Sequence, residues 1–466
     1  MKASHLSVSS GRRWLIGIVA AALVIRVALA VGVAGLETKI VDEQHYVTLA
    51  ANLADGHGFS WGAGIPTSIR PPLYPFLIAS LWKVTGTRSL DLIRWAQIPL
   101  ALVSILLVYA IGVLWFDRPT GLGAAGALSV YPSFLFSGVL LLTETLFVTL
   151  LLTFVLAFAR LEQRPSSVIA VVAGMALGLS ALARSVLWPF VIVAAALAYV
   201  VAGPSRRVRL SAAMALSLGF VVVVAPWSIR NTALQGTFTV VDTMGGLNLL
   251  MGNYAHTPED RMWDAVSLTG DRAWHATLPP QAPDGSPWTE GKKEKWAQRE
   301  AVAYIVAHPW TTLRRSLLKF GDFWGLERDL VAGIQRGYYQ APAWIAIISG
   351  GAGALAYAAT AILAVLGIFM APPRWTAHVF LLVIIFFVCG IHSVVFGHAR
   401  YHLPLVPLLL LYAASAATSG RWRRAFQVRL APLAAVSVIL LLGLIWSHEV
   451  LVRDADRIRQ LVHGAM

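Results

Sequence analysis

The feature that most constrains this chain is a series of apolar runs of membrane-spanning length. A transmembrane helix needs about 20 predominantly apolar residues to cross the hydrocarbon core of a bilayer. A backbone inside lipid must satisfy its own hydrogen bonds, so helix is the expected state of every run. We therefore predict an all-α polytopic membrane protein with about eleven transmembrane helices. The eleven runs are 14–35, 91–116, 119–140, 145–160, 166–183, 185–202, 209–228, 343–370, 376–396, 402–419 and 429–448.

Composition supports a membrane protein and excludes some functions. Of the 466 residues, 57% are hydrophobic and only 13% are charged, whereas a soluble domain carries roughly 25% charged residues. The net charge of +14 could suggest nucleic acid, but the basic residues lie in short loops between apolar runs, as membrane topology requires. The single cysteine, Cys389, allows neither an intrachain disulfide nor a cysteine metal site. Residues 1–30 resemble a secretory signal, but 14–33 is long enough to be an uncleaved first span.

The segment 71–86 decides which loops face outward. It is apolar but short, and it contains three prolines. If it crossed the membrane, two basic clusters would lie outside, against the tendency of Lys and Arg to remain in the cytoplasm. We therefore expect a re-entrant or interfacial helix. The basic clusters are Arg206, Arg207 and Arg209, and Arg421, Arg423 and Arg424.

With that topology, the polar residues collect on the extracytoplasmic side. The loops predicted on this side are residues 36–90, the turn at Thr143 and Glu144, residues 229–342 and the turn 397–401. The chain divides into an N-terminal transmembrane core (1–228), an extracytoplasmic loop domain (229–342) and C-terminal transmembrane helices (343–466). Little regular structure is expected over 231–254. A helix is expected over 289–307, capped by Thr289, followed by a basic amphipathic helix on the outer leaflet over 309–324.

The acidic candidates each have a structural alternative. Asp42 and Glu43 follow the first span, where Asp42 is well placed to be the N-cap of a helix over 43–55. Glu144 lies between two apolar runs, where an isolated carboxylate is costly unless it faces an interface or a cavity.

The basic candidates have a structural alternative as well. Arg70, Arg184 and Arg400 lie at outer helix ends, where they either snorkel to lipid headgroups or grip a phosphate. Arg26 lies within the first span and is expected to pair with a carboxylate of another helix. The irregular spacing of three nearby histidines predicts no metal site. These are His392, His398 and His402.

An ordered set of short motifs resembles the bacterial glycosyltransferase family 39 type of the GT-C superfamily, which includes protein O-mannosyltransferases and lipid A aminoarabinose transferases. The resemblance covers the whole chain. The motifs are Asp42-Glu43 with Tyr46, Arg70-Pro71-Pro72-Leu73-Tyr74-Pro75, Thr143-Glu144-Thr145-Leu146-Phe147, Pro226-Trp227 with Arg230-Asn231, Gly252-Asn253 and Arg400-Tyr401.

The resemblance implies a GT-C fold and a sugar donor on a polyprenyl phosphate. It also implies a reaction on the periplasmic or extracellular face, with inversion at the anomeric carbon. Asp42 and Glu144 match the family's acidic positions. Arg70 stands where aminoarabinose transferases carry a lysine, and Ile69 where they carry a glutamate implicated in metal binding. The departure weakens both a comparable metal site and aminoarabinose as the sugar.

Reaction chemistry assigns a role to each candidate. The catalytic candidates are Asp42, Glu144 and Glu43, with Asp42 as general base and Glu144 orienting the acceptor or the base. Arg70, Arg400 and Arg184 are expected to bind the donor phosphate, whose negative charge grows as the sugar–oxygen bond breaks. Further substrate contacts are expected at Tyr46, His57, Tyr74, Asn253 and Tyr401.

The expected partners are a polyprenyl-phosphate sugar, a lipid, glycan or protein acceptor, and the bilayer, with no nucleic acid. No cofactor is required, and a divalent metal stays open. We expect a monomer in the bacterial inner membrane. One alternative is a transporter or flippase of lipid-linked sugars, against which the absence of a sequence repeat and of midplane acids speaks. The other is a ligase or polymerase that uses polyprenyl diphosphates.

Overall fold

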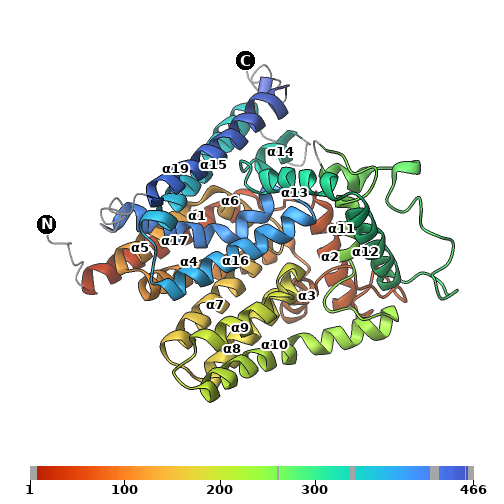
Figure 1. Cartoon of the computed structure of the whole chain (residues 1–466), viewed down its shortest axis with the longest axis horizontal. Helices are drawn as coiled ribbons and strands as arrows, with labels where there is room; N and C mark the ends of the chain where they lie inside the picture. The colour runs from red at the N-terminus through yellow and green to blue at the C-terminus, as the bar shows by residue number, and fades with distance from the viewer. Residues whose placement is uncertain (1–7, 260–261, 336–341, 420–429, 457, 460–466) are drawn as a thin grey trace.

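The computed structural model describes residues 8–259, 262–335, 342–419, 430–456 and 458–459. Across these residues the chain is helical, and its only extended pairing is an isolated bridge between Ser60 and Pro66. Long helices lie side by side, and α2, α3, α11 and α12 gather at one end of them (Figure 1). The second cluster of basic residues predicted to face the cytoplasm, 421–424, lies outside the described residues.

The N-terminal part contains the helices that carry most of the candidate residues. Two short helices, α2 and α3, lie between the first two long ones. In chain order the elements are α1 (Val8–Gly32), α2 (Val41–Ala54), α3 (Leu73–Thr85), α4 (Leu90–Trp115), α5 (Arg118–Val130), α6 (Pro132–Ser137), α7 (Glu144–Gln163), α8 (Ser167–Ala183), the 3-10 turn η1 (Ser185–Leu187), α9 (Phe190–Val201) and α10 (Arg206–Gln235).

The outer loop domain and the C-terminal helices follow. The domain holds α11 (Gly245–Gly252), η2 (Met262–Ser267), η3 (Gly270–Arg272), α12 (Glu290–Ala307), α13 (Pro309–Phe323) and α14 (Asp329–Gln335). The last group is α15 (Ala343–Met370), α16 (Trp375–Val394), η4 (Ala399–Leu405), α17 (Val406–Thr418), α19 (Leu430–His448) and a π-helical turn η5 (Glu449–Arg453).

Eight helices of the described residues are long and apolar enough to cross a membrane, and α8 and α9 are apolar but shorter. The predicted all-α membrane fold is therefore confirmed, whereas the number of crossings stays a prediction. The predicted span 119–140 is divided into α5 and α6. Proline has no N–H and disfavours helix at the preceding residue, and Tyr131 before Pro132 is extended. At 13 residues, about 20 Å, α3 is too short to cross a core of about 30 Å.

Within the part of the chain that the structure describes, Arg26 pairs with no carboxylate, contrary to the prediction. Its Nη1 donates to the carbonyls of Ala22 and Ser129, and its guanidinium lies over the ring of Phe134. Ser129 belongs to the last turn of α5, whose carbonyls have no partner within their own helix. Arg26 therefore caps the helix end that the break at Pro132 creates.

Helix α10 is the longest of the described helices and joins the transmembrane core to the outer domain. Its 30 residues measure about 45 Å, more than the core of a bilayer. It runs past the boundary expected at residue 228, so the predicted loop over 231–254 begins as helix. Glycines let α10 pack closely on α8, because a Cβ at Gly174 or Gly219 would meet carbonyl oxygens of the facing helix at 1.9 and 2.2 Å.

The outer domain matches the sequence expectations over its two main helices. Thr289 caps α12 by accepting from the amide of Lys292, as predicted. On α13 the apolar face is exposed, with Trp310 81% and Leu317 65% accessible, as expected of a helix on a lipid surface. Its Lys319, by contrast, is buried. Lys319 donates to carbonyls at the ends of α11 and α16, and burial lowers its pKa to about 7.

Candidate active site

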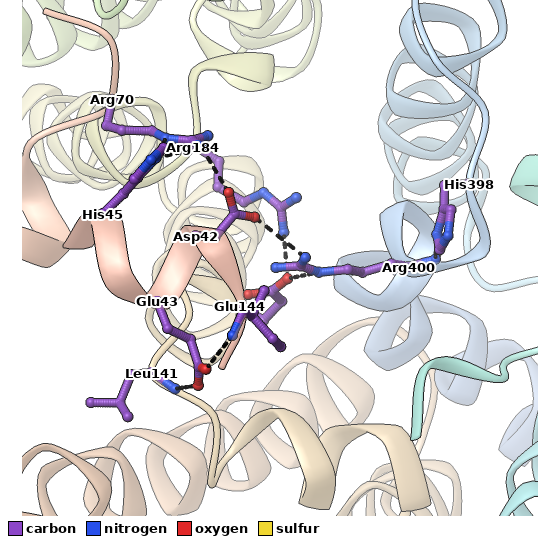
Figure 2. A network of polar contacts seen from close by, with 10 residues as sticks. Asp42, Glu43, His45, Arg70, Leu141, Glu144, Arg184, His398 and Arg400 are labelled. Atoms are coloured by element: carbon purple, nitrogen blue, oxygen red, sulfur yellow. Dashed lines mark hydrogen bonds and ion pairs between the residues drawn. The ribbon is translucent and has the colours of Figure 1, made fainter. Parts of the chain in front are cut away.

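The candidate active site lies where five segments of the chain meet. The first turn of α2 carries Asp42, and the stretch before α3 carries Arg70. Glu144 begins α7, Arg184 follows the last residue of α8, and Arg400 lies in η4. These five residues are far apart in the sequence, yet the fold brings all of them together in one network (Figure 2).

The network alternates carboxylates with guanidinium groups. Arg70 Nη2 lies 2.8 Å from Asp42 Oδ1, and Arg400 Nη1 lies 3.5 Å from Asp42 Oδ2. Arg400 also donates from Nε to Glu144 Oε1 at 2.6 Å, and Arg184 Nη1 lies 3.2 Å from the same oxygen. Arg400 thus bridges the two carboxylates, which fixes its planar group between them.

The two carboxylates of the network differ in access. The side chain of Glu144 is only 1% exposed, whereas that of Asp42 is 29% exposed. Glu144 Oε2 and Arg184 Nη1 are buried and have no hydrogen-bond partner. Arg184 Nη1 has only its ion-pair contact with Glu144 Oε1, so this nitrogen and Glu144 Oε2 both keep hydrogen-bonding capacity for a further polar ligand at this point. Arg184 is also held over the rings of Phe147 and Tyr401.

Glu43 has a different role from its neighbour Asp42. The N-cap of α2 is Ile40, and Asp42 lies inside the first turn, so the prediction that Asp42 caps the helix is wrong. Glu43 performs this task instead, because its Oε2 accepts from the amides of Lys39 and Ile40. Its Oε1 accepts from the amide of Leu141, and the side chain points away from the arginines (Figure 2).

Glu43 therefore ties the start of α2 to the segment before α7. Both of its oxygens are engaged by backbone amides, so it is placed to hold Asp42 and Glu144 at a fixed separation.

Two residues of the site were missed by sequence reasoning. His45, one turn after Asp42, accepts from Arg70 Nε and Nη2 at 3.3 and 3.0 Å. The signal was its spacing of three residues from Asp42 on one helix. Asp242 faces Arg70 and hydrogen-bonds to Ser185 and to the amide of Met244, and burial raises its pKa. It comes from the outer domain, and no local pattern marks it.

The predicted substrate contacts fall into two groups. Tyr46, Tyr74 and Tyr401 lie beside the network: the rings of Tyr46 and Tyr74 meet edge to face, and burial raises the pKa of Tyr46 to about 12. His57 lies apart, on the exposed turn after α2, and contacts Asn52. Asn253 is buried and binds Lys319 and the carbonyl of Val394.

No group of three or more His, Cys, Asp or Glu side chains that could hold a metal ion occurs in the described residues. In place of the glutamate implicated in metal binding, Ile69 offers no ligand atom on its side chain. The side chains of the network supply two carboxylates and three guanidinium groups, and His45 adds an imidazole.

The comparisons with known proteins agree with this architecture. A family model described as dolichyl-phosphate-mannose-protein mannosyltransferase matches residues 69–229, a segment that includes Arg70, Glu144 and Arg184. No curated protein sequence matches the chain significantly.

Among solved structures, the apo oligosaccharyltransferase of Archaeoglobus fulgidus matches with a TM-score of 0.51 and 14% identity, over 93% of this chain and 54% of that one. The chain thus spans about half the length of that protein. The enzyme AglB of the same organism, in complex with an inhibitory peptide and a dolichol-phosphate, matches with a TM-score of 0.47 and 12% identity, over 97% and 56% of the two chains. ArnT from Cupriavidus metallidurans, bound to undecaprenyl phosphate, matches with a TM-score of 0.42 and 15% identity, over 87% and 79%.

At these identities the structural likeness concerns the fold. The chain has the GT-C fold that the ordered motifs of the sequence indicated, and the family model matches less than half of its length.

Proposed function

We propose that this protein is a membrane glycosyltransferase that moves a sugar from a polyprenyl-phosphate donor to an acceptor on the extracytoplasmic face. The observation that carries the proposal is the network of two carboxylates and three arginines at converging helix ends. The description of the family matched over 69–229 names a lipid-phosphate-linked sugar, which fits this chemistry.

The arginines would bind the donor phosphate. As the bond between the sugar and the phosphate oxygen breaks, negative charge grows on the phosphate, and fixed cations stabilise it. Arg184 Nη1 makes an ion pair with Glu144 but no hydrogen bond of good geometry, and Arg70 and Arg400 flank the more open carboxylate. Guanidinium groups suit this task because their forked donors match phosphate oxygens.

Asp42 would act as general base. Each of its oxygens faces one arginine, and a carboxylate oxygen has two lone pairs, so a site for the acceptor proton remains on each. Asp42 is accessible to an acceptor, whereas Glu144 is sealed behind Arg184 and Arg400. We therefore assign Glu144 to holding the arginines and Glu43 to holding the helix start. A single displacement by the activated hydroxyl inverts the anomeric configuration.

The lipid tail of the donor would lie in the bilayer, and the acceptor would approach from the side of the outer domain. The positions of the arginines in the sequence support a location of this side in the periplasm of a bacterial cell. The acceptor is a lipid, a glycan or a protein, which mass spectrometry of cell-envelope glycans from a deletion strain would distinguish.

The test measures release of polyprenyl phosphate by the purified chain in detergent, with mannosyl-phosphoryl-undecaprenol as the first donor of a sugar panel. Asp42→Asn should lower the rate by about 10²–10⁴ while undecaprenyl phosphate still binds. The matched control is Asp55→Asn, which removes an exposed carboxylate at the other end of α2 and should leave the rate unchanged.

Three outcomes would overturn the proposed function or one of the assigned roles. Turnover of polyprenyl diphosphate sugars alone would make the protein a ligase or polymerase. Binding of the panel's lipids without turnover, together with vectorial transport in vesicles, would make it a transporter. A fully active Asp42→Asn with an inactive Glu144→Gln would move the base to Glu144.

A further inference from the structure

The contact between His45 and Arg70 fixes the protonation state of the imidazole. Arg70 Nη2 lies 3.0 Å from His45 Nδ1 and 2.8 Å from Asp42 Oδ1, and Arg70 Nε lies 3.3 Å from the same Nδ1. A guanidinium nitrogen only donates hydrogen bonds, so Nδ1 must present its lone pair. His45 is therefore neutral, with its proton on Nε2.

We propose that neutral His45 is the positioning residue that holds Arg70 against Asp42, and that protonation of His45 sets the acid limit of sugar transfer. This inference rests on the proposed function and adds to it a residue and a pH dependence. Trp61 supports the geometry, since its ring meets the imidazole edge to face at 4.8 Å between centroids and limits its rotation.

Protonation of His45 would disrupt the contact between Arg70 and Asp42. A proton on Nδ1 would face two guanidinium donors at hydrogen-bond distance, so Arg70 would have to turn away and its contact with Asp42 would be lost. The added positive charge would repel Arg70 as well.

The charged groups around His45 determine when it titrates. Asp42 on its own helix favours the charged imidazole, whereas Arg70 from the segment between α2 and α3 disfavours it. Asp242 faces Arg70 from the outer domain, and Arg400 of η4 engages the other oxygen of Asp42. Burial first and Arg70 second lower the pKa of His45 from its ordinary 6.5, so the imidazole is neutral at pH 7.

Three variants separate positioning from simple packing. In His45→Asn, Oδ1 occupies the same place along the side chain as Nδ1 and accepts the same hydrogen bond, but it does not titrate. We expect near wild-type release of polyprenyl phosphate at about pH 7.5 and no acid limb down to about pH 5.5. His45→Ala loses the acceptor and should be about 10-fold slower throughout. His45→Gln places its oxygen one bond further out and should resemble His45→Ala.

A second measurement needs no turnover. Because the folded-state pKa of His45 is lowered, the folded protein loses stability relative to the unfolded chain as pH falls below 6.5. The Tm of the wild type in detergent should therefore fall more between about pH 7.5 and about pH 5.5 than that of His45→Asn.

The outcomes separate the two proposals. If no lipid-phosphate sugar is turned over but the Tm difference appears, the proposed function fails while the role of His45 toward Arg70 stands. If His45→Asn keeps the acid limb of the wild type, or is as slow as His45→Ala at about pH 7.5, the positioning role is overturned.

Discussion

Two ionic clusters share the segment η4, and they differ in access. Arg400 belongs to the network of Asp42 and Glu144, whose arginine side chains are 18–25% exposed. His402, two residues further, is fully buried and binds Glu327 through Nε2 at 3.1 Å and the carbonyl of Phe323 through Nδ1.

The second cluster is sealed and satisfied. Glu327 also accepts from Tyr131 and Ser133, and the ring of Tyr357 stacks on His402 at 4.3 Å between centroids. Exposure to solvent and unfilled hydrogen-bonding capacity therefore distinguish the candidate site from the buried cluster. The buried cluster instead joins α6, η4 and the end of α13 through hydrogen bonds of His402 and Glu327.

The largest effect is expected from Arg400→Lys. Lysine keeps the charge but cannot reach Asp42 and Glu144 with one planar group, so polyprenyl-phosphate release should fall by about 10²–10³. The matched control is Arg88→Lys, which alters an exposed pair with Asp55. Equal rates for the two lysine variants would remove the distinction between the clusters.

Glu327→Gln should affect stability more than catalysis. The variant keeps an acceptor for Tyr131 but disrupts the buried contact with His402, which should cost about 1–3 kcal/mol of folding free energy. Thermal unfolding in detergent measures the loss, and the transfer rate below the Tm should remain within a few-fold of wild type. A rate as low as that of Asp42→Asn with an unchanged Tm would mean that the sealed cluster takes part in the reaction.

The smallest effect is expected from His57→Ala. The imidazole of His57 hydrogen-bonds to Asn52, on an exposed turn away from the network. The rate of sugar transfer and the Tm should both stay close to wild type, as is usual for exposed positions. A clear rise in KM for the acceptor would instead restore the substrate contact expected from the sequence.

The sequence predicted the membrane fold and most of the network, because both follow from long-range rules of topology. Apolar runs and the placement of arginines assigned Asp42, Glu144 and three arginines to one face, and the structure joins them. The number of membrane crossings was harder to predict from the sequence, although Pro132 indicated the break between α5 and α6.

Contacts between distant segments were not predictable. Glu43 replaces Asp42 as the capping residue because of how the chain enters α2, and its second partner is the amide of Leu141, 98 residues away. Arg26 binds the carbonyl of Ser129, which lacks an intrahelical partner only because α5 ends at Val130. Asp242 reaches Arg70 through the folding of the outer domain. The spacing of residues in the sequence does not predict these contacts.

Helix α10 connects the predicted membrane-spanning region to the candidate active site. It is a single helix of 30 residues with Pro226 in its interior, and we expect it to cross the bilayer. Near its C-terminal end, Asn231 and Gln235 hydrogen-bond to the hydroxyl of Ser68, two residues before Arg70. Its tilt depends on the thickness of the surrounding lipid. If Arg70 binds the lipid phosphate as proposed, the depth of that contact depends on membrane thickness, and the lipid composition of the host membrane should influence the rate of sugar transfer.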